Sequence, residues 1–194
     1  MSENRVRFAP SPTGFLHVGG LRTALFNYLF ASSTNGKTIL RIEDTDQNRK
    51  VEGAVENLIE SLEWANISFD EGPHKGGEFG PYVQSERLDL YKKYANQLLE
   101  QKDAYYCFCT EDDLTKMREE QIANKQDPRY DGRCRKLTED EVKLKLDAGI
   151  SHVIRMKIDH AQEEIVVKDL IRGDVSIKTS QIDDQVLMKS DGFP

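Results

Sequence analysis

The sequence lacks three features that would define simple classes of protein. Its apolar runs, such as residues 24–26 and 186–188, are far shorter than the about 20 residues that a membrane-spanning helix needs. Positive charge is not in excess: 34 acidic side chains against 27 basic ones give a net charge of −7, which excludes a wholly basic nucleic-acid coat. Cysteines number only three, an odd count that makes no disulfide framework. We therefore expect a soluble protein with free or metal-bound thiols.

The amino terminus also offers no targeting signal. Charges at Glu3, Arg5 and Arg7 interrupt it and leave no apolar stretch that could serve as a secretory signal. The chain contains neither internal repeats nor low-complexity segments. At 194 residues it can bury a core, and we expect a cytoplasmic monomer with no membrane attachment.

The first part of the chain has the pattern of an α/β protein. Short apolar runs at residues 5–9 and 38–42 predict strands, each followed by a segment with helical spacing of apolar residues. Those helical patterns begin after residues 14, 50 and 87. Alternation of this kind is typical of a parallel sheet covered by helices.

The pattern changes near Lys102. Residues 105–109 form a short aromatic strand, and Thr110 and Thr138 each begin a polar helix with a capping box. From residue 152 onward the pattern is strand-like, with Ile154, Met156 and Ile158 alternating against more polar neighbours. We divide the chain into residues 1–102, an inserted α+β segment at 103–185, and a return towards the first domain at 186–194.

A turn between the first strand and the first helix carries the densest chemical signal. His17 and the pair Gly19-Gly20 stand where a strand gives way to the amino terminus of a helix. Free backbone N–H groups and the helix dipole make that position suitable for phosphate, and glycines let a ligand approach the backbone. The alternative is a glycine-rich turn with a surface histidine. A second phosphate motif, Gly36-Lys37-Thr38, is not a P-loop, because Ala31 replaces the required glycine and a helix precedes it.

Eight blocks of the chain resemble bacterial-type glutamyl-tRNA synthetases, a family of class I aminoacyl-tRNA synthetases. The blocks are residues 7–14, 17–20, 23–28, 41–46, 70–73, 84–87, 130–135 and 189–192. They run in family order from one end of the chain to the other, so chance similarity is not a serious alternative. The resemblance implies the first half of a Rossmann-like catalytic domain with an inserted domain that holds the tRNA acceptor stem.

Two departures from the family pattern matter. Gly20 stands at the last position of the first signature, where class I synthetases in general have histidine; glycine is usual there in the glutamyl branch, but it removes one possible phosphate donor. The second signature, a Lys-Met-Ser-Lys-Ser type loop, is absent, and so is the helical anticodon-binding region. We therefore expect an amino-terminal fragment that does not by itself activate glutamate at a useful rate.

The resemblance implies roles for named residues. His17, Gly19 and Gly20 are the catalytic signature; ATP binding adds Pro10 and Thr13, and glutamate binding is assigned to Arg7, Ala9, Ser11 and Glu43. Contacts to tRNA(Glu) are assigned to Thr45, Asp46, Arg49, Arg129, Arg133 and Arg135. The implied substrates are L-glutamate, ATP and tRNA(Glu), with Mg2+ bound mainly by the nucleotide phosphates.

Simpler interpretations stay open for several of these residues. Cationic and hydroxyl groups suit the carboxylates of glutamate and an anion suits its ammonium, but Arg7 and Glu43 could instead pair with each other. Asp46 could simply cap a helix. The arginines near residue 130 stand out in an acidic chain and suit phosphate contact, although most such clusters are solvated surface.

The three cysteines form a pattern compatible with zinc. Cys107 and Cys109 are separated by one residue, and 24 residues lie between Cys109 and Cys134. Zinc takes a fourth ligand. Some relatives have histidine where this chain has Lys136, whereas Tyr130 corresponds to the replacement used in the glutamyl-queuosine tRNA(Asp) synthetase. Three free cysteines are the alternative.

The function that the resemblance implies is ATP-dependent formation of glutamyl-adenylate, followed by transfer of the acyl group to tRNA(Glu). The shorter queuosine-modifying relative is a second candidate. A free-standing module that binds an acceptor stem or a partner without catalysis is a third.

Overall fold

The computed structural model describes residues 4–46, 49–169 and 172–194. Two compact units make up the chain, and the boundary between them lies between Leu88 and Asp89. That boundary follows the first residue of the helix at residues 88–100, whereas the sequence pattern changes near Lys102. The assignment of residues 1–102, 103–185 and 186–194 to separate domains stays a prediction.

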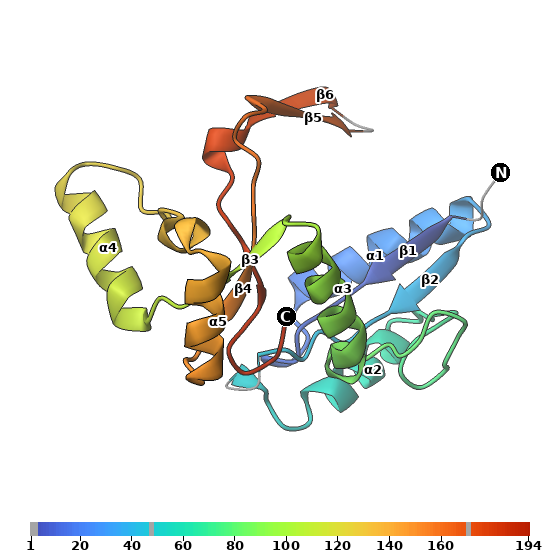
Figure 1. The fold of residues 1–194 in the computed structure, drawn as a ribbon. Coiled ribbons are helices and arrows are strands. Elements are labelled where there is room, and N and C mark those ends of the chain that lie inside the picture. The colour runs from blue at the N-terminus through green and yellow to red at the C-terminus, as the bar shows by residue number, and fades with distance from the viewer. Residues whose placement is uncertain (1–3, 47–48, 170–171) are drawn as a thin grey trace. The chain divides into compact units, whose positions relative to one another are not determined.

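The first unit contains a parallel pair of strands, as the alternating pattern predicts. β1 (Arg5–Phe8) pairs in parallel with β2 (Lys37–Leu40), and α1 (Val18–Ser33) connects them (Figure 1). The same parallel arrangement is extended by single bridges from Ile39 to Glu71 and from Ile42 to Val83. α2 (Ala54–Trp64) and the short η2 (Gln84–Arg87) follow. Because α1 precedes the Asn35-Gly36 turn and β2 follows it, the rejection of a P-loop is confirmed.

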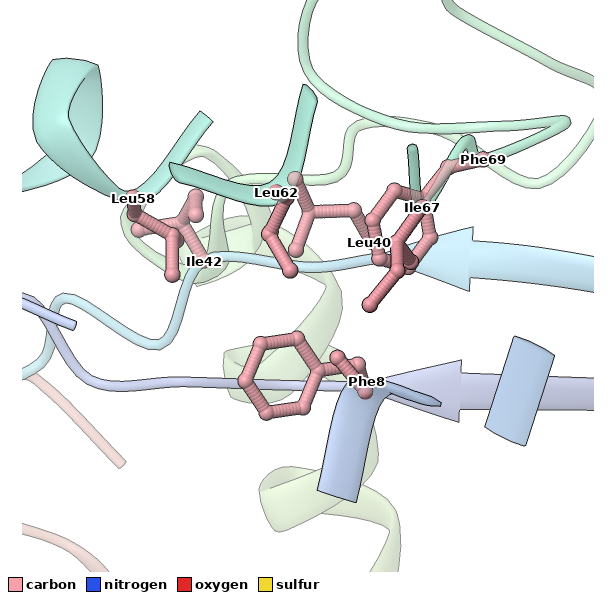
Figure 2. Close-up of a cluster of buried hydrophobic side chains, with 8 residues drawn as sticks. Phe8, Leu40, Ile42, Leu58, Leu62, Ile67 and Phe69 are labelled. Atoms are coloured by element: carbon pink, nitrogen blue, oxygen red, sulfur yellow. The ribbon is translucent and has the colours of Figure 1, made fainter. Parts of the chain in front are cut away.

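A compact apolar core holds the two strands against α2. Figure 2 shows Leu58 and Leu62 of α2 above Leu40 and Ile42, with Phe8 of β1 on the other side. Leu40, Ile42 and Leu62 are almost completely buried. Burial of each such side chain stabilises the fold by roughly 1.5–3 kcal/mol. This core fixes the carboxyl ends of β1 and β2, from which the predicted site residues follow.

The second unit is built on antiparallel pairing. α3 (Leu88–Glu100) leads into β3 (Ala104–Cys107), which pairs with β4 (Val153–Met156), and β4 pairs in turn with β7 (Val186–Met188). A separate hairpin joins β5 (Glu164–Asp169) to β6 (Gly173–Lys178) (Figure 1). β7 thus completes the sheet of this unit, although the sequence pattern placed residues 186–194 with the return to the first domain.

Two helices of the second unit begin where the capping pattern predicts. Thr110 caps α4 (Glu111–Ala123) and Thr138 caps α5 (Glu139–Asp147), and both capping boxes are complete. The short η3 (Arg133–Lys136) lies between them, and η4 (Thr179–Gln181) follows β6. Among the described residues, no helix is long and apolar enough to cross a membrane.

Candidate functional site

Two separate groups of residues carry the predicted chemistry, one in each unit. The first group lies where the chain leaves β1 and β2. Arg41 donates its backbone N–H to the Phe8 carbonyl at 3.0 Å, and Glu43 donates to the Pro10 carbonyl at 2.9 Å. These bonds continue the parallel register beyond the strands. Two segments are therefore neighbours, as expected for the carboxyl ends of parallel strands. One carries Arg7, Ala9 and Ser11, and the other carries Glu43.

His17 occupies the amino terminus of α1. Its Nδ1 accepts a hydrogen bond from the Gly19 N–H at 3.1 Å, so the histidine caps the helix with its own ring. A neutral imidazole whose Nδ1 accepts carries its proton on Nε2, and that N–H is left to donate to a ligand. No acidic side chain lies in the first turn of α1 to repel an anion. The arrangement therefore offers donors and a favourable helix dipole to a phosphate.

The packing around His17 and Leu16 leaves no room for a Cβ atom at Gly19 or Gly20. A Cβ on Gly19 would stand 2.8 Å from Cε1 of His17, and one on Gly20 would stand 2.8 Å from a methyl of Leu16. Any larger residue at position 19 would push the imidazole off the helix terminus. A hollow of about 400 Å³ adjoins the ring. It is lined by Leu16, His17, Val18, Leu21, Glu60, Ser61 and Trp64.

The Glu43 carboxylate forms an ion pair with Arg41, a residue to which the sequence pattern assigns no role. Arg41 Nη2 contacts Glu43 Oε1 in an ion pair, with the Glu43 side chain 30% exposed. The alternative in which Arg7 and Glu43 pair with each other is wrong, because the Arg41 guanidinium, two residues along the same segment, reaches the carboxylate instead. Within residues 4–46, 49–169 and 172–194, the Arg7 side chain is exposed and forms no hydrogen bond or ion pair.

The segment after Glu43 is held in place by carboxylates. Buried Asp44 accepts hydrogen bonds from the Ser85 N–H at 2.9 Å and the Ser85 hydroxyl at 2.7 Å. Asp46 accepts from the Arg49 N–H at 3.2 Å and pairs with its Nε at 2.6 Å. This contact has the geometry of the local cap that was the simpler interpretation of Asp46. Thr45, the remaining residue of this predicted tRNA contact, is partly buried.

The second group is a cluster of three sulfurs in the other unit. The sulfur atoms of Cys107, Cys109 and Cys134 all lie within 4.8 Å of one another, and the Cys109 and Cys134 sulfurs are 3.6 Å apart. Two ligand sulfurs of a tetrahedral zinc are separated by about 3.8 Å when each Zn–S bond is about 2.3 Å. The fold thus brings together thiols that 24 residues separate in the sequence.

Tyr130 completes the cluster. Its buried hydroxyl oxygen lies 3.3 Å from the Cys107 sulfur and 3.8 Å from the Cys109 sulfur, and it accepts the Cys134 N–H at 3.2 Å. An oxygen and a sulfur on one tetrahedral zinc stand about 3.5 Å apart. The Tyr130 oxygen therefore stands close to ligand spacing from the sulfurs of Cys107 and Cys109. Lys136 is exposed at the end of η3.

The same contacts perturb the acidity of the cluster. A hydrogen bond from the Cys134 thiol, opposed by burial, lowers the pKa of Cys107 to about 4. That same bond raises the pKa of Cys134, and burial raises the pKa of Tyr130. The hydrogen bond between the two thiols thus shifts the pKa values of Cys107 and Cys134 in opposite directions.

Each arginine of the predicted tRNA contact near residue 130 has a partner within the protein. Arg129 donates to the Ser180 carbonyl, Arg133 pairs with Asp131 at 2.9 Å, and Arg135 pairs with buried Asp184. Hydrogen bonding to these carboxylates raises the pKa of Arg133 and of Arg135. These contacts fix the backbone around η3, and they also reduce the charge that the arginines present to an outside anion.

Comparison with known proteins identifies the family. The model of the catalytic domain of class I tRNA synthetases for glutamate and glutamine (E and Q) matches residues 3–194. The chain belongs to this family. It is 58% identical to the glutamate–tRNA ligase of Chloroherpeton thalassium over 205 residues, which covers 100% of this chain and 40% of that protein. With the glutamate–tRNA ligase of Chlorobaculum parvum it shares 55% identity, over 98% of this chain and 39% of that protein.

Solved structures agree with this family. A crystal structure of a glutamate tRNA ligase from Elizabethkingia meningosepticum, in complex with its amino acid, superposes with a TM-score of 0.91 at 46% identity. All of this chain and 40% of that chain are covered. This member of the synthetase family therefore spans about two fifths of the length of the relatives that it matches.

Proposed function

We propose that this chain supplies the nucleotide-binding and amino-acid-binding part of a glutamate–tRNA ligase. The observation that carries the proposal is the match to the catalytic domain over residues 3–194, together with the convergence of its motif residues at the ends of β1 and β2. The reaction is attack of a glutamate carboxylate on the α-phosphate of ATP, which gives glutamyl-adenylate and pyrophosphate. The acyl group then moves to the terminal ribose of tRNA(Glu).

In this proposal the fold contributes positioning and charge rather than covalent chemistry. The Nε2–H of His17 and the N–H groups of Gly19 and Gly20 hold phosphate oxygens, with Pro10 and Thr13 bordering the nucleotide. The nucleotide brings Mg2+ on its own phosphates. These donors stabilise the negative charge that develops on the α-phosphate as the carboxylate oxygen attacks.

Glutamate recognition is assigned to the neighbouring strand ends. Arg7 and Ser11 face the substrate carboxylates, Ala9 leaves room for the side chain, and Glu43 binds the ammonium. An exposed Arg7 without an ion-pair partner in the described part of the chain supports the first role. The second is compatible with the Arg41 contact, because that contact involves only Oε1 of Glu43.

The second unit is proposed to hold the tRNA acceptor stem. Arg129, Arg133 and Arg135 lie on residues 129–136, an arginine loop that ends in η3 and is held by internal contacts of its backbone and side chains. An anchored loop loses little entropy when it binds an RNA backbone. Thr45, Asp46 and Arg49 are proposed as contacts of the first unit.

We also propose that Cys107, Cys109, Cys134 and Tyr130 bind zinc. The support is the grouping of the three sulfurs within 4.8 Å and the distances of 3.3 Å and 3.8 Å from the Tyr130 oxygen to the Cys107 and Cys109 sulfurs, which are compatible with tetrahedral coordination. The role of the metal is structural: it joins β3, which carries Cys107, to Cys134 in η3 and to Tyr130 in the loop before η3. Zinc would then keep the arginine loop in one conformation.

The assignments of the first unit are tested in a chimera in which this chain replaces the matching residues of the Chloroherpeton thalassium enzyme. Pyrophosphate exchange gives KM values for glutamate and for ATP. Glu43→Gln should raise KM for glutamate with little effect on KM for ATP, because it removes the anion that faces the ammonium. His17→Ala should instead lower the rate of adenylate formation by about 100-fold or more, with a smaller effect on glutamate. Equal damage to both affinities in Glu43→Gln would refute the assignment. Glu63→Gln, an exposed change on α2, is the control.

Metal analysis tests the zinc site on the chain itself. We expect about one zinc per chain, thiols that react slowly until a chelator is added, and weaker binding in Tyr130→Phe. Three readily modified thiols in a folded, metal-free protein would show that the cysteines bind no metal.

A further inference from the structure

Arg155 is a buried cation with no role in the assignments above. It lies on β4, on the face that it shares with Val153, and is only 8% exposed. Cross-strand pairing sets Arg155 opposite Tyr105 and Val153 opposite Cys107, so Arg155 is diagonal to Cys107 on the same face of the sheet. Burial of an arginine costs free energy unless nearby groups compensate its charge.

The contacts of Arg155 point to the sulfur cluster. Its guanidinium carbon stands 4.0 Å from the centre of the Tyr130 ring, and Nη1 donates to the Asp184 carbonyl at 2.9 Å. Its Nε is buried and has no hydrogen-bond partner among the described residues. No carboxylate pairs with Arg155 in the described ranges, since the Asp184 side chain is taken by Arg135 and Tyr105. The cation therefore lacks a carboxylate counter-ion of its own.

A zinc ion bound by three thiolates has a net negative charge, because the three ligand charges exceed the two of the metal. That excess grows if the Tyr130 oxygen also ionises on the metal. A buried anionic centre needs a nearby cation or hydrogen-bond donors, and groups that surround metal ligands tune affinity in this way. Arg155 has the required charge, lies on the Cys107 face and covers the Tyr130 ring.

We infer that Arg155 is the positioning residue that compensates the negative charge of the metal-loaded cysteine cluster and holds the Tyr130 ring against it. This inference rests on the zinc site proposed above. It accounts both for the burial of the arginine and for its lack of a carboxylate partner. The Asp184 carbonyl, which accepts from Arg155, belongs to the residue whose carboxylate fixes Arg135, so the metal centre and the arginine loop share one support.

The experiment measures zinc affinity of the whole chain by competition with a chromophoric chelator. Two neutral variants, Arg155→Met and Arg155→Gln, are compared with Arg155→Lys, which keeps the charge, and with Arg118→Met, which removes an exposed charge from α4. We expect zinc affinity to fall about 10- to 100-fold in the neutral variants. Arg155→Lys should stay much nearer to the unmodified chain, and Arg118→Met should match it.

A spectroscopic measurement separates this role from a general loss of structure. The chain loaded with Co2+ has absorption bands that depend on the ligand set and its geometry, and circular dichroism of the chelator-treated variants reports their folding. The neutral variants should shift the cobalt bands, because the Tyr130 ring loses the cation that covers it.

The inference is overturned if a folded neutral variant binds zinc as tightly as the unmodified chain. It is also overturned if Arg155→Lys loses as much affinity as Arg155→Met, since shape rather than charge would then matter. An unmodified chain that binds no zinc would overturn both this inference and the metal site. Binding by the unmodified chain without an effect of Arg155 would leave the metal site standing and remove only the inference.

Discussion

Acid should destabilise the first unit through one carboxylate, Glu71. Its side chain, 8% exposed, pairs with Arg5 at 2.6 Å and 2.7 Å through both oxygens and accepts the Tyr82 hydroxyl. The Tyr82 oxygen in turn accepts the Phe79 N–H at 3.2 Å, and the Arg5 guanidinium lies 4.6 Å from the Phe79 ring centre. One carboxylate thus connects β1 to the loop of residues 72–82.

The effect on stability follows from the shift in acidity. Hydrogen bonds from Arg5 and then from Tyr82 lower the pKa of Glu71 from 4.5 to about 2. A carboxyl whose pKa is lower in the folded chain stabilises the fold above its unfolded pKa, and this stabilisation is lost as the pH falls towards the folded pKa. The full contribution at neutral pH is at most about 3 kcal/mol. About 2 kcal/mol of it is lost by pH 3.

Urea denaturation at pH 7, 4.5 and 3 measures this contribution. Circular dichroism and the fluorescence of Trp64, the single tryptophan, which lies in the same unit, follow unfolding. Glu71→Gln should be less stable than the unmodified chain at pH 7, and the difference should shrink by about 2 kcal/mol at pH 3. Glu63→Gln serves as the control and should show a small difference at every pH. A difference between Glu71→Gln and the unmodified chain that is independent of pH would refute the reasoning.

Urea denaturation of three variants tests the close approach at Gly36 and the cap of α5. Gly36→Ala should destabilise the chain by about 2 kcal/mol, because its Cβ would collide with the backbone carbonyl of Asn4, whereas Gly14→Ala, with nothing within 4 Å, should be nearly neutral. Equal stabilities of these two variants would contradict the predicted collision. Thr138→Val removes the hydroxyl that accepts the backbone N–H of Glu141 at 3.3 Å and should cost about 1 kcal/mol. Unchanged stability there would mean that water caps α5 equally well.

Local signals in the sequence predicted most of the secondary structure, because each depends on neighbouring residues alone. The strands at residues 5–9 and 38–42 and the capping boxes at Thr110 and Thr138 are confirmed, with ends that differ by a few residues. The same is true of His17, whose place between a strand and a helix is visible in the sequence. The parallel pairing of β1 with β2 is also confirmed, since a helix connects them.

Contacts between residues that are distant in the sequence were harder to predict from the sequence. The Arg41 side chain that engages Glu43 is not distinguished by any pattern, because a charged residue after a strand is ordinarily exposed. The Asp44–Ser85 contact joins residues 41 positions apart, and only the fold brings them together. Ion pairs of Arg133 and Arg135 likewise depend on loop conformations that composition does not determine.

The burial of Arg155 is the feature that the sequence predicts least well. Strand alternation places Ile154 and Met156 on one face and Val153 and Arg155 on the other, and a charged side chain is ordinarily exposed. The fold instead buries Arg155, because Cys107 of the neighbouring strand and Tyr130 of a loop lie against that face. Burial of a cation is favourable only where anionic groups gather, and here those groups are thiols, which are neutral until they ionise. A hydropathy pattern treats cysteine as apolar, so it does not show that Cys107 could carry the negative charge that balances Arg155. The pairing of β3 with β4 shows this, because it places Cys107 diagonal to Arg155 on the same face of the sheet.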